Sequence, residues 1–227
     1  MRLTLNKFRK ITNLKKKLNF KDFDLINNYG LFCGDHNLFK TLQIFELIKR
    51  TKNIKGDIIE LGIHNGNTSL LIKKILDIYK IKKKLFLLDH FKGLTTYDKK
   101  DTSISKKFYG KYKGNKKKIK IFLNFFNFKN IKFLDIDASK IKKSYFKKSV
   151  FSLAYFDMDL YSPTIKALEA INKNMSLGSL IVFDQGHKKM FAERLAIKDF
   201  LKNNKNYKKI ILDNERQPDI ILKKIKY

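Results

Sequence analysis

Short apolar runs alternate with helix-like segments along the chain from residue 57 onward. The predicted strands lie at residues 57–62, 85–89, 131–135, 150–156 and 179–184. The predicted helices between and after them lie at residues 68–82, 119–128, 164–174 and 191–201. This alternation is typical of a parallel sheet whose strands are connected by crossover helices, so we expect an α/β fold.

The two ends of the chain add further elements. Two apolar runs at residues 209–212 and 219–222 are close enough in sequence to form an antiparallel pair. Residues 1–55 form a predicted N-terminal helical arm with one helix at 38–50, which leaves residues 56–227 as the main domain. A polar excursion at residues 95–118 is rich in Lys, Tyr and Gly, and we expect it to lie outside the core.

The composition fits one globular domain. At 227 residues, folding buries about 70% of the chain's surface, so a hydrophobic core can form without disulfides. The lone Cys33 excludes an internal disulfide and fits a reducing compartment. No apolar run reaches the roughly 18 residues of a membrane span, and the basic N-terminus does not lead into a signal peptide. We therefore predict a cytoplasmic protein without a membrane span.

The net charge of +30 has two interpretations. Clustered Lys and Arg would indicate a surface for nucleic acid or an anionic membrane. However, the lysines are spread along the whole chain, and they accompany many Asn, Ile, Phe and Tyr residues. This pattern indicates a general bias in amino-acid composition rather than a binding surface. Only five arginines are present, although Arg is the residue suited to bidentate phosphate recognition. We favour the compositional interpretation and keep a nucleic-acid partner as the alternative.

A glycine turn follows the first predicted strand. Gly62 and Gly66 allow a sharp turn and a close approach of a ligand to the backbone, and the next helix offers unpaired N–H groups. An acidic residue, Glu60, ends the strand, which suits a cationic sulfonium better than a pyrophosphate. The turn therefore predicts a site for S-adenosylmethionine (SAM), and a plain glycine turn without a ligand is the alternative.

Acidic residues also end the next two strands. Asp89 can accept hydrogen bonds from ribose hydroxyls, and Asp137 lies where a group meeting the adenine amino group is expected. In an open α/β sheet, ligands bind at the carboxyl ends of the strands. The predicted cofactor-binding set is Glu60, Gly62, His64, Asn65, Gly66, Ser69, Asp89, His90, Asp137, Ala138 and Asp157.

A second group of polar residues ends the fourth and fifth strands. Asp157, Asp184 and Gln185 offer oxygen ligands suited to Mg²⁺, which would chelate a substrate and lower the pKa of an attacking hydroxyl. The alternative is that Asp157 meets the cofactor and Asp159 caps the following helix. The predicted catalytic residues are Asp157, Asp159 and His187, the last as a general base.

Five stretches of the chain together resemble the macrocin O-methyltransferase family, whose members methylate sugar hydroxyls of macrolides and aminocoumarins. They are residues 56–66, 88–94, 156–164, 178–186 and 193–200, in order and with compatible spacing. The resemblance implies a Rossmann-like class I methyltransferase. Its sheet would be mostly parallel and seven-stranded, with helices on both faces and a final antiparallel strand. SAM would lie at the first two strand ends and Mg²⁺ near the fourth and fifth.

The chain departs from this family at one place. Family members usually carry Asp-Asp-Tyr where this chain has Asp184-Gln185-Gly186, so a neutral amide replaces an anionic ligand. Catechol O-methyltransferases, which are similar in layout, use an Asp-Asn pair there, so an amide is compatible with Mg²⁺.

The resemblance implies a Mg-assisted, SAM-dependent O-methyltransferase acting on a hydroxyl of a sugar or a glycosylated small molecule. The alternatives are an RNA methyltransferase and a non-catalytic Rossmann-like binding protein in a polysaccharide pathway. A homo-oligomer is left open.

Overall fold

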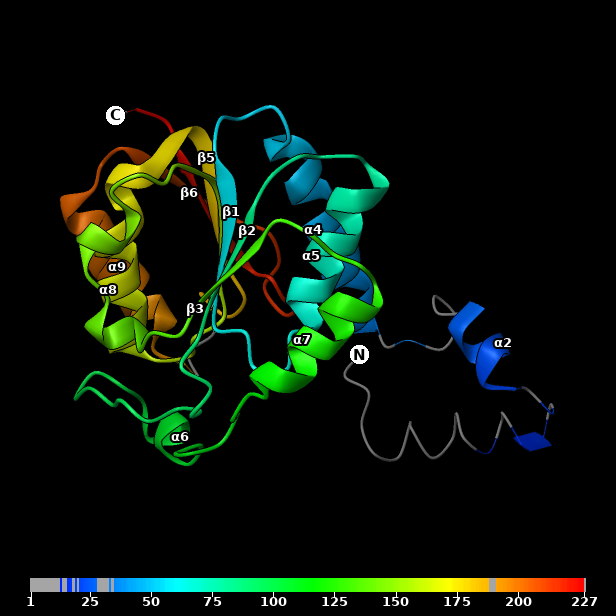
Figure 1. The fold of residues 1–227 in the computed structure, drawn as a ribbon. Helices are drawn as coiled ribbons and strands as arrows, with labels where there is room; N and C mark the ends of the chain where they lie inside the picture. The colour runs from blue at the N-terminus through cyan, green and yellow to red at the C-terminus, as the bar shows by residue number, and fades with distance from the viewer. Residues whose placement is uncertain are drawn as a thin grey trace.

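The protein is a sheet of seven strands with helices on both faces (Figure 1). The computed structural model describes residues 35–187 and 191–226, together with residues 13, 16, 17, 19, 21–27 and 33. Its strands are β1 (Asp57–Leu61), β2 (Leu85–Leu88), β3 (Ile131–Leu134), β4 (Phe151–Phe156), β5 (Met175–Phe183), β6 (Tyr207–Ile211) and β7 (Ile220–Lys224).

The strand order is β3-β2-β1-β4-β5-β7-β6. The pairs from β3 to β5 are all parallel, whereas β7 runs antiparallel to both β5 and β6. The order reverses between β1 and β4, and this reversal opens a crevice at the carboxyl ends of the strands. The predicted mostly parallel sheet with a final antiparallel strand is therefore confirmed.

Helices cover the sheet in two layers (Figure 1). On one face lie α4 (Asp35–Thr51), α5 (Asn67–Ile78) and α7 (Lys116–Phe125), and on the other lie α8 (Tyr161–Ile171) and α9 (Glu193–Asn203). The short elements are α2 (Asp22–Asn27), α6 (Ser103–Lys106), η1 (Ala138–Lys140), η2 (Lys143–Phe146) and η3 (Asn172–Asn174). No described helix is long and apolar enough to cross a membrane.

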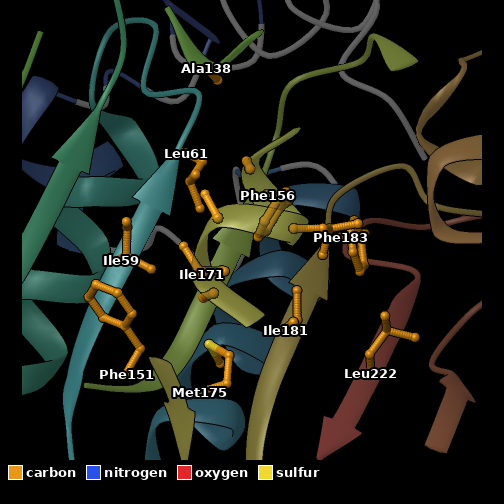
Figure 2. Packing of buried hydrophobic residues seen from close by; sticks show 14 of the residues in the cluster. Ile59, Leu61, Ala138, Phe151, Phe156, Ile171, Met175, Ile181, Phe183 and Leu222 are labelled. Carbon is orange, nitrogen blue, oxygen red and sulfur yellow. The ribbon is translucent and has the colours of Figure 1, made fainter. Parts of the chain in front are cut away.

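The core consists of two hydrophobic layers, one on each face of the sheet. Because side chains alternate along a strand, Ile59 and Leu61 of β1 pack toward α8, whereas Ile58 packs toward α5. Figure 2 shows the first layer, in which Phe156, Phe183 and their neighbours fill the space between strands and helices. Both faces of the central strands are buried, which explains their continuous apolar sequence.

The helix α4 is part of this packing, although it belongs to the predicted N-terminal arm. Ile44, Leu47 and Ile48 are buried in the same layer as β1, β4 and α5. The helix begins at Asp35, a little before the expected residue 38. The domain boundary at residue 55 remains a prediction.

One difference from the predicted elements is the start of β5. The strand begins at Met175 rather than near residue 179, because Gly178 adopts a positive φ of 79° and carries the chain through an irregularity. The pairing passes from Phe151 with Met175 directly to Leu153 with Leu180, so β5 contains a bulge. Gly178 therefore lies within the strand.

A buried isoleucine of β5 tests how much the core depends on this packing. Ile181→Ala should destabilise the fold by about 2–5 kcal/mol, because Ile181 is fully buried and its loss leaves a cavity. Ile211→Ala is the matched control, since that isoleucine is 50% exposed on β6, and it should change stability by about 0.5 kcal/mol or less. Urea denaturation of both variants measures the difference, and equal losses would contradict this account of the core.

Candidate functional site

A pocket of about 320 Å³ lies at the carboxyl ends of the parallel strands. Ten of the residues predicted from the sequence line it: Gly62, His64, Asp89, His90, Asp137, Ala138, Asp157, Asp159, Asp184 and Gln185. Five others are not among the described residues that line it: Glu60, Asn65, Gly66, Ser69 and His187. Which of these residues bind a ligand or act in catalysis remains a prediction.

The strand register brings the polar residues together. Phe156 at the end of β4 lies opposite both Leu61 of β1 and Phe183 of β5. The ladder continues one residue further, since Asp157 N donates to Leu61 O and Asp184 N donates to Phe156 O, both at 2.9 Å. Asp157 and Asp184 are therefore neighbours in space although 26 residues separate them along the chain.

The turn after β1 requires glycine at one position. Gly62 has a φ of 85°, and a Cβ atom there would lie 2.0 Å from the carbonyl oxygen of Asp157. No side chain fits at that distance, so the β1 and β4 ends can approach each other only with glycine. Gly66 also has a positive φ, of 79°, and is the N-cap residue of α5.

Asp89 fixes the shape of this turn. Its carboxylate accepts hydrogen bonds from the backbone N–H groups of Ile63 (2.8 Å), His64 (3.0 Å) and Phe91 (2.6 Å). Burial opposes ionisation, but hydrogen bonds from the His90 side chain and these N–H groups hold the pKa of Asp89 below its usual value. Asp89 is thus an ionised, oriented carboxylate on the wall of the pocket.

The third strand end is organised around Asp137. Its Oδ1 accepts hydrogen bonds from the Ser139 N–H (2.9 Å) and hydroxyl (2.7 Å), and its Oδ2 accepts one from the Thr96 hydroxyl (3.3 Å). His90 Nε2 lies 3.1 Å from Thr95 Oγ1. Thr95, Thr96 and Tyr112 line the pocket, so the polar excursion forms part of its wall.

The excursion is anchored to α8 and α9. Asp101 Oδ1 accepts a hydrogen bond from the Tyr161 N–H at the start of α8 (2.8 Å). Lys100 Nζ donates to Tyr161 Oη (2.7 Å) and to Asp199 Oδ2 of α9 (2.6 Å). Asp101, rather than Asp159, therefore satisfies the first N–H of the helix.

Glu60 has a different environment from the one expected. Its side chain is buried, and Oε2 accepts a hydrogen bond of 2.5 Å from the Ser69 hydroxyl of α5. Burial raises the pKa of Glu60 to about 8, so this carboxyl is largely neutral at pH 7. Its contact with a sulfonium remains a prediction.

Asp157 and Asp184 share a cation from the N-terminal part of the chain. Lys40 Nζ of α4 lies 2.8 Å from Asp184 Oδ1 and 3.8 Å from Asp157 Oδ2. Tyr155 Oη donates to the same Asp184 oxygen at 2.5 Å. Burial and the charge of Asp184 raise the pKa of Asp157 to about 7, and Lys40 opposes this rise. Burial opposes the charge on Lys40, but Asp184 and Asp157 hold the pKa of its ammonium above the usual value.

A second buried cluster lies beside this pair. Gln185 Nε2 donates to Asp159 Oδ1 at 3.1 Å. Glu193 of α9 accepts hydrogen bonds from the backbone N–H groups of Met158 (2.9 Å), Asp159 (3.3 Å) and Gln185 (3.3 Å). Burial raises the pKa of both Asp159 and Glu193 well above the usual range. Glu193 therefore holds together the loops that follow β4 and β5.

His187, the predicted general base, has a backbone contact. Its N–H donates to Asp219 Oδ2 at 3.1 Å. The next described residue is Phe191, so the segment at 188–190 lies outside the described residues. The catalytic role of His187 remains a prediction.

The predicted Mg²⁺ ligands do not fit a resident divalent cation. The Lys40 ammonium already lies against the oxygens of Asp157 and Asp184, and Tyr155 occupies a further lone pair of Asp184. Gln185 directs its amide N–H₂ toward Asp159, while its Oε1 is buried without a hydrogen-bond partner. Across the described part of the chain, no three His, Cys, Asp or Glu side chains lie close enough together to hold a metal ion.

Sequence reasoning missed Lys40, Tyr155 and Glu193. A signal for Lys40 was present, because residues 40, 44, 47 and 48 share one face of a helix and three of them are apolar. A lysine on an apolar stripe points to a buried partner for its charge. Tyr155 and Glu193 stand within apolar and helical patterns that do not indicate which way they point.

The glycine turn can be tested against a second glycine. Gly62 and Gly110 both have positive φ values, of 85° and 68°, but nothing lies within 4 Å of a Cβ added at Gly110. Gly62→Ala should therefore destabilise the fold by about 1–3 kcal/mol more than Gly110→Ala, because only the first adds a clash to the backbone strain. Urea denaturation of the two variants measures this, and an equal loss would show that the turn can relax.

Comparison with solved structures supports the methyltransferase fold. CalS11, a calicheamicin methyltransferase, superposes with a TM-score of 0.80 at 21% identity over 98% of this chain and 94% of that chain. An apo structure of CalS11 describes it as a TDP-rhamnose 3'-O-methyltransferase. The O-methyltransferase NovP superposes with a TM-score of 0.69 at 14% identity over 82% of this chain and 79% of that chain. An O-methyltransferase from Bacillus cereus in complex with S-adenosylhomocysteine gives a TM-score of 0.55 at 12% identity, over 95% of this chain and 96% of that chain.

Sequence comparison identifies the family. No curated protein sequence is similar enough to match. Residues 28–214 match the model of the family described as Macrocin-O-methyltransferase (TylF). This match covers most of the 227 residues, and it agrees with the resemblance carried by the strand-end motifs. The chain belongs to the macrocin O-methyltransferase family of SAM-dependent methyltransferases.

Proposed function

We propose that this protein transfers the methyl group of SAM to a hydroxyl of a sugar, either a nucleotide sugar or the sugar of a glycosylated small molecule. The observation that carries the proposal is the Asp157 carboxyl, which lies in the pocket beside the Gly62 turn. The pKa of Asp157, about 7, suits a group that accepts a proton near neutral pH. The family and its O-methyltransferase fold neighbours support the same reaction class.

The residues divide into two roles in the proposed mechanism. SAM, when bound, supplies a methyl group on a positively charged sulfur. The Gly62 turn and the ionised Asp89 would bind and orient it at the first two strand ends. Asp157 would accept the proton of the acceptor hydroxyl while the hydroxyl oxygen bonds to the methyl carbon of SAM and the sulfur–carbon bond breaks. Much of the rate would come from holding the two reactants in line.

The charge of the pocket favours a sugar over an RNA acceptor. Five carboxylates line it, and Lys40 is the single lysine among the described lining residues. The wall suits hydroxyl groups and a sulfonium, and it lacks the row of lysines that would bind the successive phosphates of an RNA strand. A site that binds a phosphate backbone would carry its lysines where the chemistry takes place. RNA methylation therefore remains the weaker candidate.

Magnesium has no part in the proposed mechanism. Asp157 and Asp184, two of its predicted ligands, are paired with Lys40, and Gln185 contributes no charge. We therefore assign the Asp157 carboxylate as the group that accepts the proton of the acceptor hydroxyl, without the help of a metal ion.

Asp157→Asn tests the assigned role. An amide cannot take up the proton, so kcat should fall by about 100- to 10,000-fold. Binding of S-adenosylhomocysteine should weaken by less than about tenfold, or 1.4 kcal/mol. Calorimetry measures the binding, and methyl transfer to TDP-rhamnose, the acceptor named for CalS11, provides the rate. If wild-type protein binds neither SAM nor S-adenosylhomocysteine, the protein is a non-catalytic member of the fold.

The pH dependence of methyl transfer gives an independent test. Because the pKa of Asp157 is raised to about 7, the carboxyl is protonated below that pH and cannot act as a base. We expect kcat/KM to rise as the pH increases through about 7 and then to level off. The residual activity of Asp157→Asn should lack this rise. A flat profile for the wild-type protein would contradict the assignment of Asp157 as the base.

A further inference from the structure

Lys40 lies where the predicted metal ion would have to bind. Its ammonium group is 2.8 Å from Asp184 Oδ1 and 3.8 Å from Asp157 Oδ2, and it lines the pocket. We propose that Lys40 is the built-in cation of this pocket, which fixes Asp157 and Asp184 in place and makes the reaction independent of a divalent metal ion. The inference rests on the proposed function and adds a positioning residue to it.

The two carboxylates need a cation for electrostatic reasons. They follow directly paired residues of neighbouring strands, so their charges are held close together by the sheet. Asp184 is almost fully buried, at 3% exposure, and Asp157 is partly buried. Two such carboxylates repel each other unless a positive charge or a shared proton offsets the repulsion. Lys40 supplies the positive charge.

The ammonium group is held on a rigid element. Lys40 lies on α4, whose residues Ile44, Leu47 and Ile48 are buried against the sheet. Its Nζ also lies 5.4 Å from the centre of the Tyr155 ring, and the same tyrosine donates its hydroxyl hydrogen to Asp184. Lys40, Tyr155 and Asp184 therefore form one connected group whose position depends on helix packing.

A divalent cation and Lys40 exclude each other. Both require Asp184 Oδ1 and Asp157 Oδ2, and two cations at about 4 Å would repel each other in this partly buried site. The third predicted ligand does not favour the metal, since Gln185 is neutral and donates its amide hydrogen to Asp159. With Lys40 in place, the carboxylate oxygens of Asp157 and Asp184 already have a cation, so they need no metal ion.

The role of Lys40 is to orient the base. Its ammonium group lies closer to Asp184 than to Asp157, which leaves Asp157 with the weaker contact and 33% of its side chain exposed. Asp184 is held by Lys40 and Tyr155, while Asp157 remains open to a substrate hydroxyl. Lys40 acts through Asp157 and is a positioning residue.

Mn²⁺ binding tests the inference without an acceptor. Electron paramagnetic resonance of the wild-type protein, with saturating S-adenosylhomocysteine, should show only free Mn²⁺. Lys40→Met keeps the aliphatic stem but removes the charge, so Asp157, Asp184 and the Gln185 oxygen become available. This variant should bind Mn²⁺ at least about tenfold more tightly than wild type, or 1.4 kcal/mol. Lys49→Met is the matched control, because Lys49 is on the same helix but pairs with Glu46 at the surface.

Methyl transfer to TDP-rhamnose provides the second readout. Wild-type activity should be unchanged by excess EDTA. Lys40→Met should lose at least about tenfold in kcat/KM in EDTA and regain activity with Mg²⁺. Lys40→Arg keeps the positive charge, so without metal it should match the activity of Lys40→Met with Mg²⁺. Tight Mn²⁺ binding by the wild-type protein, or loss of its activity in EDTA with restoration by Mg²⁺, would overturn the inference.

Calorimetry separates this outcome from failure of the proposed function. If the wild-type protein binds S-adenosylhomocysteine but needs Mg²⁺, only the role of Lys40 is wrong. If it binds no S-adenosylhomocysteine, the proposed function itself fails. The wild-type measurements decide the question even if Lys40→Met does not fold.

Discussion

The parallel pairing of β4 with both β1 and β5 is the constraint on which the pocket depends. Phe156 lies opposite Leu61 on one side and Phe183 on the other, and backbone hydrogen bonds continue for one residue beyond. This register sets Gly62, Asp157 and Asp184 side by side. A shift of β4 by one residue would turn the side chains of β4, Asp157 among them, to the opposite face of the sheet, because strand side chains alternate.

Charge balance is the second determinant of the site. The strand ends gather carboxylates, and each has its own compensation. Asp89 is surrounded by backbone N–H groups, Asp184 by Lys40 and Tyr155, and Glu193 by the N–H groups of two loops. Of Asp89, Asp157 and Asp184, Asp157 has the longest compensating contact, 3.8 Å from Lys40. Among these three, it is therefore the carboxylate with the most freedom to accept a proton.

The sequence predicted the sheet and most of the pocket wall, because an acidic residue that ends an apolar run marks a strand end. Asp89, Asp157 and Asp184 were predicted this way, and all three line the pocket. The direction of Glu60 could not be predicted, because β1 is buried on both faces and lacks the alternation that would assign a side chain to one of them. Lys40 was missed for a different reason. Its partners lie more than 100 residues away, and only helix packing brings them together.

The order of the last strands has a consequence for folding during synthesis. Within the described sheet, β6 pairs only with β7, which is made after it and inserts between β5 and β6. Until β7 emerges, β6 has no place in the sheet and the edge of β5 stays exposed. The segment just before β7 also supplies Gln217 to the pocket wall, while Asp219 N–H donates to Phe183 O beside Asp184. The pocket thus reaches its final form only when β7 has docked, and the edge of β5 stays open from the synthesis of β5 until that of β7.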